Sequence, residues 1–429
     1  MTINKYQQLW TFADEAFNGS GGFSDGGYIV KYPRESDDKY QERKKIAYYT
    51  NIFSSKVNRY IGYLSKHTPT RDTPNKMIRM IFDNVDNKGN SINVFMSNFA
   101  KNAKVRGCNL ILIDMPKTLP SDLKTQLDTR ALPYFVEIQP ERVTEYKIGQ
   151  NGKFEYIAFS DVLDESVYGK SSTKNIIRYY DKTKWIVFDT DNTILETGEH
   201  NLNECPVILF SENGSFPTSG EFTQIAGLAK RHYNLTSELD EILRSQTFSI
   251  LTIQADNPSD VEIKLSTDNA ISYAKECNMP EFIAPPSAPA EIYIQKIKDI
   301  ENQIDKIAFD VSTNQSKESG IALDIKFQGL SASLSNFAVR LEDLELRTFE
   351  LVYKYLNLNF DITISYPQNF NIIDIEKEIS ILSEMKQLID SPTYFKLKTL
   401  QIISNDLNTI DVEEFDKISA EIEDISKET

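Results

Sequence analysis

The sequence predicts an α+β protein with unusually long helices. The segment from Ala290 to Tyr366 contains no proline, and its apolar residues recur every three or four positions in two runs, as in amphipathic helices. Several earlier segments are short, apolar or alternating, and are bounded by proline or glycine, as strands are. The strand-like and helix-like patterns occupy different parts of the chain. This indicates a mixed α+β body and not a series of β-α-β units.

Composition and charge limit the classes of protein to which this chain can belong. Of its 429 residues 40% are hydrophobic and 11% aromatic, which suffices for two or three folded domains. The formal net charge is -16, whereas proteins whose main task is to grip phosphate backbones usually carry a basic surface. No apolar run approaches the roughly 20 residues of a membrane span, and no signal sequence is recognisable. We therefore expect a soluble, intracellularly made protein that contacts no membrane.

The negative charge is concentrated at the carboxy-terminal end. Residues 371–429 hold 14 acidic and 6 basic residues, whereas residues 31–60 hold 8 basic and 4 acidic ones. The sequence thus predicts an acidic carboxy-terminal module that follows a mildly basic amino-terminal one.

The first seventy residues predict a helix, a glycine-rich turn and a second helix. The glycine-rich segment Asn18–Gly27 lacks the Gly-Lys-Ser/Thr ending that lets a loop hold phosphate, so we interpret it as a turn. The second helix is predicted to carry Tyr40, Arg43, Ile46, Tyr49 and Ile52.

Strand patterns dominate the following part of the chain. Cys108–Asp114 is apolar throughout and is closed by Pro116, which predicts a buried strand. Tyr134–Ile138 alternates before Pro140. Further β-rich segments are Ile176–Tyr180, Trp185–Asp189 and Pro206–Phe210.

Two long amphipathic helices are predicted on either side of a small α/β insert. The first helix has an apolar stripe from Phe222 to Ile242. The insert combines strands at Ser249–Gln254 and Val261–Leu265 with a helix at Ser266–Glu276. The second helix has an apolar stripe formed by Ile297, Ile300, Ile304, Ile307 and Val311.

A polar segment, Ser312–Gly320, separates the second helix from the longest one. The stripe of the longest helix includes Leu330, Leu334 and Leu341, and nothing stops the helix before about Asn357. At 1.5 Å per residue it would span roughly 50 Å, which exceeds the width of an ordinary compact domain. Such helices pack against copies of themselves or cross an extended assembly, although a plain α-hairpin fits this segment alone about as well. A strand at Phe360–Tyr366 and short helices from Asp374 complete the chain.

The sequence offers few groups for catalysis. The three histidines are not spaced as metal ligands, the three cysteines are far apart, and no serine occupies a Gly-x-Ser-x-Gly turn. Carboxylates are so numerous that any proposed acid/base pair would be arbitrary. We therefore expect no enzyme, no metal and no cofactor.

Several motifs, taken in order, resemble those of tailed-bacteriophage portal proteins, the head-to-tail connectors. The amino-terminal motifs are Gly27-Tyr28-Ile29, Pro33-Arg34-Glu35, Tyr40-x-x-Arg43 and Asn51. The motifs of the strand region are Gly107-x-x-x-Ile111-Leu112-Ile113-Asp114-x-Pro116, Pro133-Tyr134 to Glu141, and Cys205-Pro206-Val207. The last motif is Glu318-Ser319-Gly320 followed by Leu330, Leu334 and Leu341-Glu342. Each motif alone is weak, but their order and spacing cover nearly the whole chain.

The resemblance implies a portal-type fold with named parts. These parts are an α+β wing (1–220), two stem helices (221–247 and 290–311) around a small α/β clip (248–289), a tunnel loop (312–318), a second wing part with the long helix (319–370), and a short helical crown (371–429). It also implies a stem contact between subunits through Ile297, Ile300, Ile304, Ile307 and Val311.

The resemblance further implies a role in the virion. In this family twelve copies form a ring at one capsid vertex, and double-stranded DNA passes through the channel non-specifically during packaging and ejection. Partners are the terminase packaging motor, the major capsid protein and tail adaptors, and assembly takes place in the host cytoplasm. The tunnel loop would present Asn314, Gln315, Ser316 and Lys317 to the channel.

The acidic composition suits a channel in which DNA slides, because each neutralised phosphate adds affinity through counterion release. Lys317 is then a candidate for a transient contact with DNA, but a solvated loop lysine is about equally compatible with the sequence. Two other classes stay open. A non-portal virion structural, adaptor or scaffold protein would form oligomers without a channel, and a nucleotidyl-transferring enzyme would need clustered carboxylates and a phosphate loop.

Overall fold

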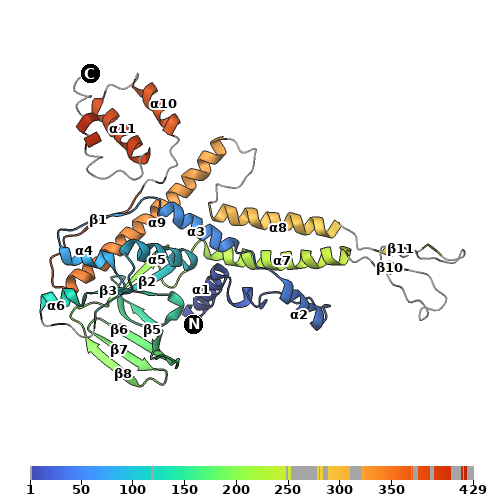
Figure 1. The fold of residues 1–429 in the computed structure, drawn as a ribbon, viewed down its shortest axis with the longest axis horizontal. Coiled ribbons are helices and arrows are strands. Elements are labelled where there is room, and N and C mark those ends of the chain that lie inside the picture. The colour runs from blue at the N-terminus through green and yellow to red at the C-terminus, as the bar shows by residue number, and fades with distance from the viewer. Residues whose placement is uncertain are drawn as a thin grey trace. The chain divides into compact units, whose positions relative to one another are not determined.

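The structure is a computed structural model that describes most of the chain (Figure 1). The described residues are 2–116, 120, 122–247, 250–252, 278–279, 281–283, 288–309, 320–368, 370, 375–386, 391–406, 417–418 and 420–422. They form helices and mainly antiparallel strand pairs in different parts of the chain, which confirms the predicted α+β class.

The chain forms two compact units, and neither is continuous in sequence. The first unit comprises Met1–Arg59, Asn98–Leu112 and Glu137–Asp310. The second unit comprises Tyr60–Ser97, Ile113–Val136 and Val311–Thr429.

The described strands form four sheets. A three-stranded sheet has the order β3-β2-β9, and a five-stranded sheet has the order β4-β5-β6-β7-β8, with β1 pairing with β12 and β10 with β11. The strand bounds are β1 Thr70–Asp72, β2 Cys108–Asp114, β3 Tyr134–Ile138, β4 Val143–Ile148, β5 Phe154–Asp164, β6 Thr173–Asp181, β7 Lys184–Asp189, β8 Ile194–Glu199, β9 Val207–Ser211, β10 Ile250–Thr252, β11 Glu281–Ile283 and β12 Thr363–Ser365.

The five-stranded sheet is an antiparallel meander with one buried face. Ile157 lies opposite Tyr180, and Arg178 lies opposite both Phe159 and Val187, so these side chains share a face. All of them except Arg178 are at most 5% exposed. Strand β8 forms an edge of the sheet, and most of its side chains are exposed. The predicted strands at β2, β3, β6, β7 and β9 are confirmed, whereas β4, β5 and β8 were not predicted.

The helices of the first unit begin at the amino terminus. Their bounds are α1 Thr2–Asn18, α2 Asp37–Ile46, α7 Thr223–Thr247 and α8 Ala288–Ile307, while α3 Ile52–Leu64 and α5 Ile92–Arg106 each contribute residues to both units. The single helix predicted from Tyr40 to Ile52 is wrong, because α2 ends at Ile46 and a new helix starts at Ile52. Asn51 causes the break, since its Oδ1 accepts from the backbone N–H of Ser54 at 2.9 Å and so caps α3.

The amino-terminal helix is fixed to the first unit by its aromatic residues. The indole Nε1 of Trp10 donates to the carbonyl oxygen of Thr218 at 2.8 Å, and the ring stacks on Phe216. Tyr146 and Phe154 in turn contact Phe216 edge-on. Trp10 is fully buried, so this cluster joins α1 to the five-stranded sheet.

The second unit is arranged along its longest helix. Its helices are α4 Lys76–Asp83, α6 Leu123–Asp128, α9 Gly320–Tyr355, α10 Ile375–Met385 and α11 Pro392–Asp406. Helix α9 has 36 residues, as the long proline-free run predicts, and Asn357 follows it with a left-handed φ of 52°. The buried guanidinium of Arg71 pairs with Glu345 of α9, whose carboxylate also accepts from the hydroxyl of Tyr366 at 2.6 Å. This cluster fixes β1 and β12 on α9.

Parts of the prediction lie outside the described residues. These are the second strand and the helix of the insert, Val261–Leu265 and Ser266–Glu276. The division into wing, stem, clip, tunnel loop and crown stays a prediction. None of the helices that the structure describes combines the length and the apolar character needed to cross a membrane.

Gly107 provides a test of the packing between α5 and the entry to α7. Its φ is +83°, and a Cβ at this position would overlap the backbone of Gly220. Gly107→Ala should therefore lower the free energy of unfolding by about 3 kcal/mol or more, because neither backbone can move aside. Gly152 also has a positive φ, +76°, but a Cβ added there would meet no other atom. Gly152→Ala should therefore lower the free energy of unfolding by only about 1 kcal/mol. Denaturant unfolding measures both values, and equal losses would contradict this account.

Candidate functional site: the helical hairpin and its anchor

Helices α7 and α8 form an antiparallel hairpin within the first unit (Figure 1). The pair lies side by side along its length and extends away from the five-stranded sheet of the same unit. The connection between the helices includes the short β10–β11 pair.

The five predicted stem residues differ in how far the structure buries them. Ile300 is 2% exposed and Ile304 is fully buried, whereas Ile297 and Ile307 are half-buried and Val311 lies outside the described residues. Ile300 and Ile304 are therefore buried within a single chain, where α8 packs against α7. Their assignment to a contact between subunits stays a prediction. The predicted channel residues Asn314, Gln315, Ser316 and Lys317 also lie outside the described residues.

Two polar contacts accompany the apolar seam of the hairpin. Nε2 of His232 on α7 lies 3.3 Å from Oε1 of Glu301 on α8. Nζ of Lys56 on α3 lies 2.5 Å from Oδ1 of Asp305, and both side chains are largely buried. The first contact joins α8 to α7 and the second joins α8 to α3. Together they restrict rotation of α8 about its own axis.

Asn234 attaches α7 to the segment that precedes α2. Its Oδ1 accepts from the backbone N–H of Val30 at 2.8 Å, and its Nδ2 donates to the carbonyl oxygen of Tyr28 at 2.9 Å. The side chain thus bonds to two backbone groups of one segment. Asn234 is 6% exposed, so the loss of these bonds would leave buried polar groups without partners.

Arg43 completes the attachment from α2. Its Nε and Nη2 each donate to a different carboxylate oxygen of Glu35 at 2.8 Å, and Nη2 also donates to the carbonyl oxygen of Val30 at 2.7 Å. Its Nη1 donates to the hydroxyl of Ser237 on α7 at 3.3 Å. Arg43 is 1% exposed. The guanidinium therefore joins three segments, and its fork matches the carboxylate geometrically.

Glu238 joins the same segment to both helices of the hairpin. Its carboxylate interacts with the hydroxyls of Tyr32 and of Tyr293, the latter on α8. Burial, followed by the interaction with Glu238, raises the pKa of each tyrosine, so both hydroxyls stay protonated at neutral pH. We call the set Arg43, Glu35, Tyr32, Asn234, Ser237 and Glu238 the hairpin anchor.

The sequence motifs gave part of the anchor and missed the rest. Glu35 and Arg43 belong to the quoted motifs, and Tyr40 of the same motif donates from its hydroxyl to the carbonyl oxygen of Ile29 at 2.8 Å. The α7 members Asn234, Ser237 and Glu238 were not predicted. Ser237 and Glu238 follow Asn234 by three and four positions, so all three lie on one side of α7. This polar side, which interrupts the apolar pattern, was the signal that could have identified them.

The outer surface of the hairpin carries apolar side chains. Ile292 is 69% exposed, Ile294 is 42% exposed, and Leu243 near the end of α7 is 44% exposed. These side chains lie toward the part of the hairpin where β10 and β11 follow. Large aliphatic side chains gathered on one projecting element are typical of a surface that contacts another protein.

The described residues provide no centre for metal binding. They contain no group of three or more histidine, cysteine or acidic side chains placed to hold a metal ion. Cys108 and Cys205 are free and buried, and Cys277 lies outside the described residues. Burial raises the pKa of the Cys205 thiol to about 12, so this sulfur is a poor nucleophile at neutral pH.

Replacing Arg43 should destabilise the first unit strongly. Arg43→Met leaves Glu35 buried and without a counter-charge, so the free energy of unfolding should fall by about 3–5 kcal/mol. Arg34 is a matched control, because it is exposed and has no ion-pair partner among the described residues. Arg34→Met should change the free energy of unfolding by less than about 0.5 kcal/mol. Urea unfolding measures both free energies. If Arg43→Met lowered the free energy of unfolding as little as Arg34→Met does, Arg43 would not be holding the hairpin in place.

The contribution of Glu35 should depend on pH. The hydrogen bond from Arg43 holds the pKa of Glu35 below its ordinary value. A carboxyl with a lowered folded-state pKa binds fewer protons folded than unfolded, so it stabilises above its unfolded pKa of about 4.3 and loses this effect as pH falls. Wild type should therefore exceed Glu35→Gln in stability most near neutral pH, with the gap shrinking below about pH 4.3.

The control for this titration is Glu291→Gln. Glu291 is an exposed carboxylate of α8 with no ion-pair partner among the described residues. This change should alter the free energy of unfolding by less than about 0.5 kcal/mol. A stability gap between wild type and Glu35→Gln that stays constant from neutral to acidic pH would show that the charge of Glu35 contributes nothing.

Comparison with known proteins gives similarity to solved structures only. No family model matches the chain, and no curated protein matches it. One similar structure is the neck of an empty GTA particle computed with C6 symmetry, with a TM-score of 0.47 and 9% identity, covering 80% of this chain and 89% of that chain. Another is the virion of a native gene transfer agent (GTA) particle, with a TM-score of 0.44 and 9% identity, covering 91% and 98%.

Proposed function

We propose that this chain is a portal subunit of a tailed bacteriophage, which forms a ring at one capsid vertex and acts in the virion without catalytic activity. The observation that carries the proposal is the α7–α8 hairpin. It is closed along its inner seam and fixed to its unit by buried polar contacts, yet it exposes Ile292, Ile294 and Leu243 outward. A surface of this kind suits repeated contacts between identical copies.

The order of the elements supports the proposal. An α+β body precedes the hairpin, a helix of 36 residues follows it, and α10 and α11 follow that helix. This is the order that the motif resemblance implies for wing, stem, long wing helix and crown. The motif residues that lie in the first unit also have identifiable structural roles, as the pair of Glu35 with Arg43 and the capping of α3 by Asn51 illustrate.

A ring requires a heterologous contact, in which one surface of a subunit meets a different surface of the next. Ile292 and Ile294 are two residues apart in α8 and so lie about 200° apart around its axis, on two different sides of the hairpin. We assign these two sides to the contact. Because Ile300 and Ile304 are buried within one chain, we place the contact at Ile292 and Ile294, with Ile297 and Ile307 at its margin. Twelve copies would then surround a channel through which double-stranded DNA passes.

The net charge of -16 suits such a channel, because DNA slides only where few phosphates are neutralised. Lys317, repeated around the ring, would supply a weak contact at one level. The segment between the stem helices would dock the packaging motor and later the tail adaptors, and the outer body would meet the major capsid protein.

The rival function is a non-portal virion structural, adaptor or scaffold protein. Such a protein could use the same exposed apolar side chains to assemble. It differs from a portal in forming particles without a central channel, so imaging of the particles distinguishes the two functions.

Ile292 provides the direct test of the subunit contact. Ile292→Asp places a charge on an exposed helix position, so the free energy of unfolding of the subunit should change by about 0.5 kcal/mol or less. Assembly should nevertheless fall at least tenfold in the fraction of large particles, because a ring repeats the contact at every subunit. Sedimentation velocity measures the particle distribution, and circular dichroism checks the fold.

The matched control is Val167→Asp. Val167 is 67% exposed in the loop between β5 and β6, against 69% for Ile292, and it is not part of the hairpin. This variant should assemble as wild type does. If Ile292→Asp also assembles as wild type does, the outer side of the hairpin is not the contact between subunits.

A further inference from the structure

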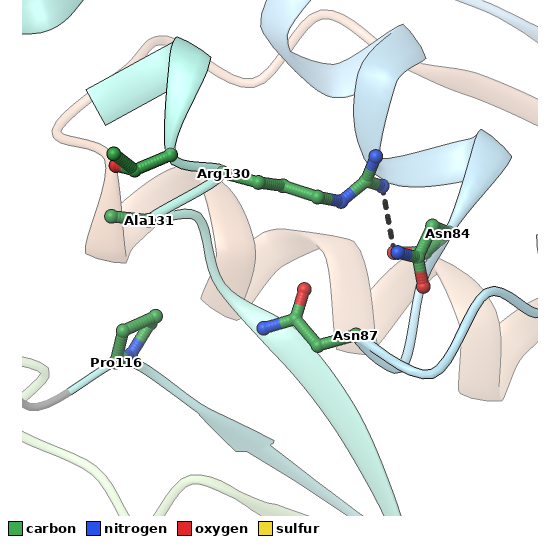
Figure 2. A pocket seen from close by; sticks show the side chains of 6 residues that line it. Asn84, Asn87, Pro116, Arg130 and Ala131 are labelled. Atoms are coloured by element: carbon green, nitrogen blue, oxygen red, sulfur yellow. Dashed lines mark hydrogen bonds between the residues drawn. The ribbon is translucent and has the colours of Figure 1, made fainter. Parts of the chain in front are cut away.

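The second unit contains a polar pocket that the proposed function does not use (Figure 2). The pocket has a volume of about 340 Å³, which is at the lower end for small-ligand sites. It is formed by the residues just beyond α4, by Pro116 two residues beyond β2, and by the residues just beyond α6. Its lining residues are Asn84, Asn87, Pro116, Thr129, Arg130 and Ala131.

Arg130 supplies the only charge among the lining residues. Its Nη2 donates to the carbonyl oxygens of Met80 and Asn84 at 2.6 and 2.8 Å, at the carboxyl end of α4. Both protons of Nη2 are thereby used, while Nη1 and Nε have no partner among the described residues. No carboxylate of the described residues pairs with Arg130. The guanidinium is held in place and retains unused donors.

Two asparagines add amide groups to the same wall. Oδ1 of Asn84 accepts from the backbone N–H of Gly89 at 2.7 Å, so its Nδ2 is the group that stays available. Asn87 is exposed, has a left-handed φ of 57°, and its side chain makes no hydrogen bond with the described residues. Figure 2 shows the Asn87 amide between Arg130 and Pro116, pointing into the space that these residues border.

The nearest acidic residue of this loop does not compete for the donors. The carboxylate of Asp86 accepts from the backbone N–H groups of Lys88 and Asn90, at 2.9 and 3.2 Å, and from Nδ2 of Asn90 at 2.7 Å. These bonds hold it within its own loop. The pocket wall therefore combines one positive charge and two amides without a carboxylate.

We propose that this pocket binds an oxyanion through Nη1 of Arg130 and the side-chain amides of Asn84 and Asn87. Since Nη2 is saturated, Arg130 makes a single charge-assisted bond and not a bidentate one, and the amides supply the remaining donors. Pro116 and Ala131 form the apolar border of the site and limit its size. A free phosphate and the carboxylate of a partner protein share this chemistry. The proposal does not depend on the function proposed above.

The test titrates the full chain by calorimetry with inorganic phosphate and, separately, with acetate, at constant ionic strength and with chloride as the blank. Wild type should bind one anion per chain. Asn87→Asp keeps the shape and the tolerance for a left-handed backbone but places a negative charge in the wall. The affinity of this variant should be at least tenfold lower.

Asn192→Asp is the matched control. Asn192 is also exposed and left-handed, with a φ of 64°, but it lies in the turn between β7 and β8 of the first unit. The anion affinity of the Asn192→Asp variant should equal that of wild type. Binding of phosphate but not acetate would identify a phosphate site, and binding of acetate would identify a carboxylate site. Absence of binding by wild type, or equal binding by Asn87→Asp, would overturn the proposal.

Discussion

The buried contact between Arg43 and Glu35 is the interaction on which the attachment of the hairpin depends. A guanidinium that is 1% exposed is tolerated only because all three of its nitrogens have acceptors, from the carboxylate of Glu35 to the hydroxyl of Ser237. Val30 and Glu35 belong to the segment before α2, Arg43 lies on α2, and Ser237 lies on α7, so these three segments must meet in one arrangement. Asn234 and Glu238 then extend this constraint along α7, and Tyr293 brings α8 into it.

This arrangement separates two tasks along the hairpin. The inner seam and the anchor fix α7 and α8 within one chain, where Ile300 and Ile304 are buried. The outer side chains Ile292 and Ile294 do not contribute to that packing and are available to a second copy. In the proposed ring, rigid attachment would keep these outer side chains at the same level in every subunit, which a closed symmetric assembly requires.

The long helices could be predicted from sequence because their apolar stripes recur over many turns, as in α7 and α9. Strand β2 was equally clear, since it is buried on both faces and therefore apolar throughout. Strand β8 could not be predicted, because its exposed sequence Ile194–Glu199 has no buried face to impose alternation. Strand β5 was missed because its alternation is interrupted where Ile157, Ala158 and Phe159 are buried in succession.

The site was harder to predict than the fold. The periodicity of α8 identified Ile300 and Ile304 as apolar, but periodicity gives no information on whether the partner helix belongs to the same chain. The anchor joins residues about two hundred positions apart, such as Val30 and Asn234, and the pocket joins Asn84 to Arg130. Contacts of this kind depend on tertiary structure, and a single sequence carries no direct signal of them.

The central claim is that the chain forms a ring with a channel, and electron microscopy of the purified protein in negative stain tests it most directly, with particle mass measured in parallel. The account predicts rings with a central hole and a mass of about twelve subunits. Closed oligomers without a channel would contradict it and would favour a structural or scaffold protein.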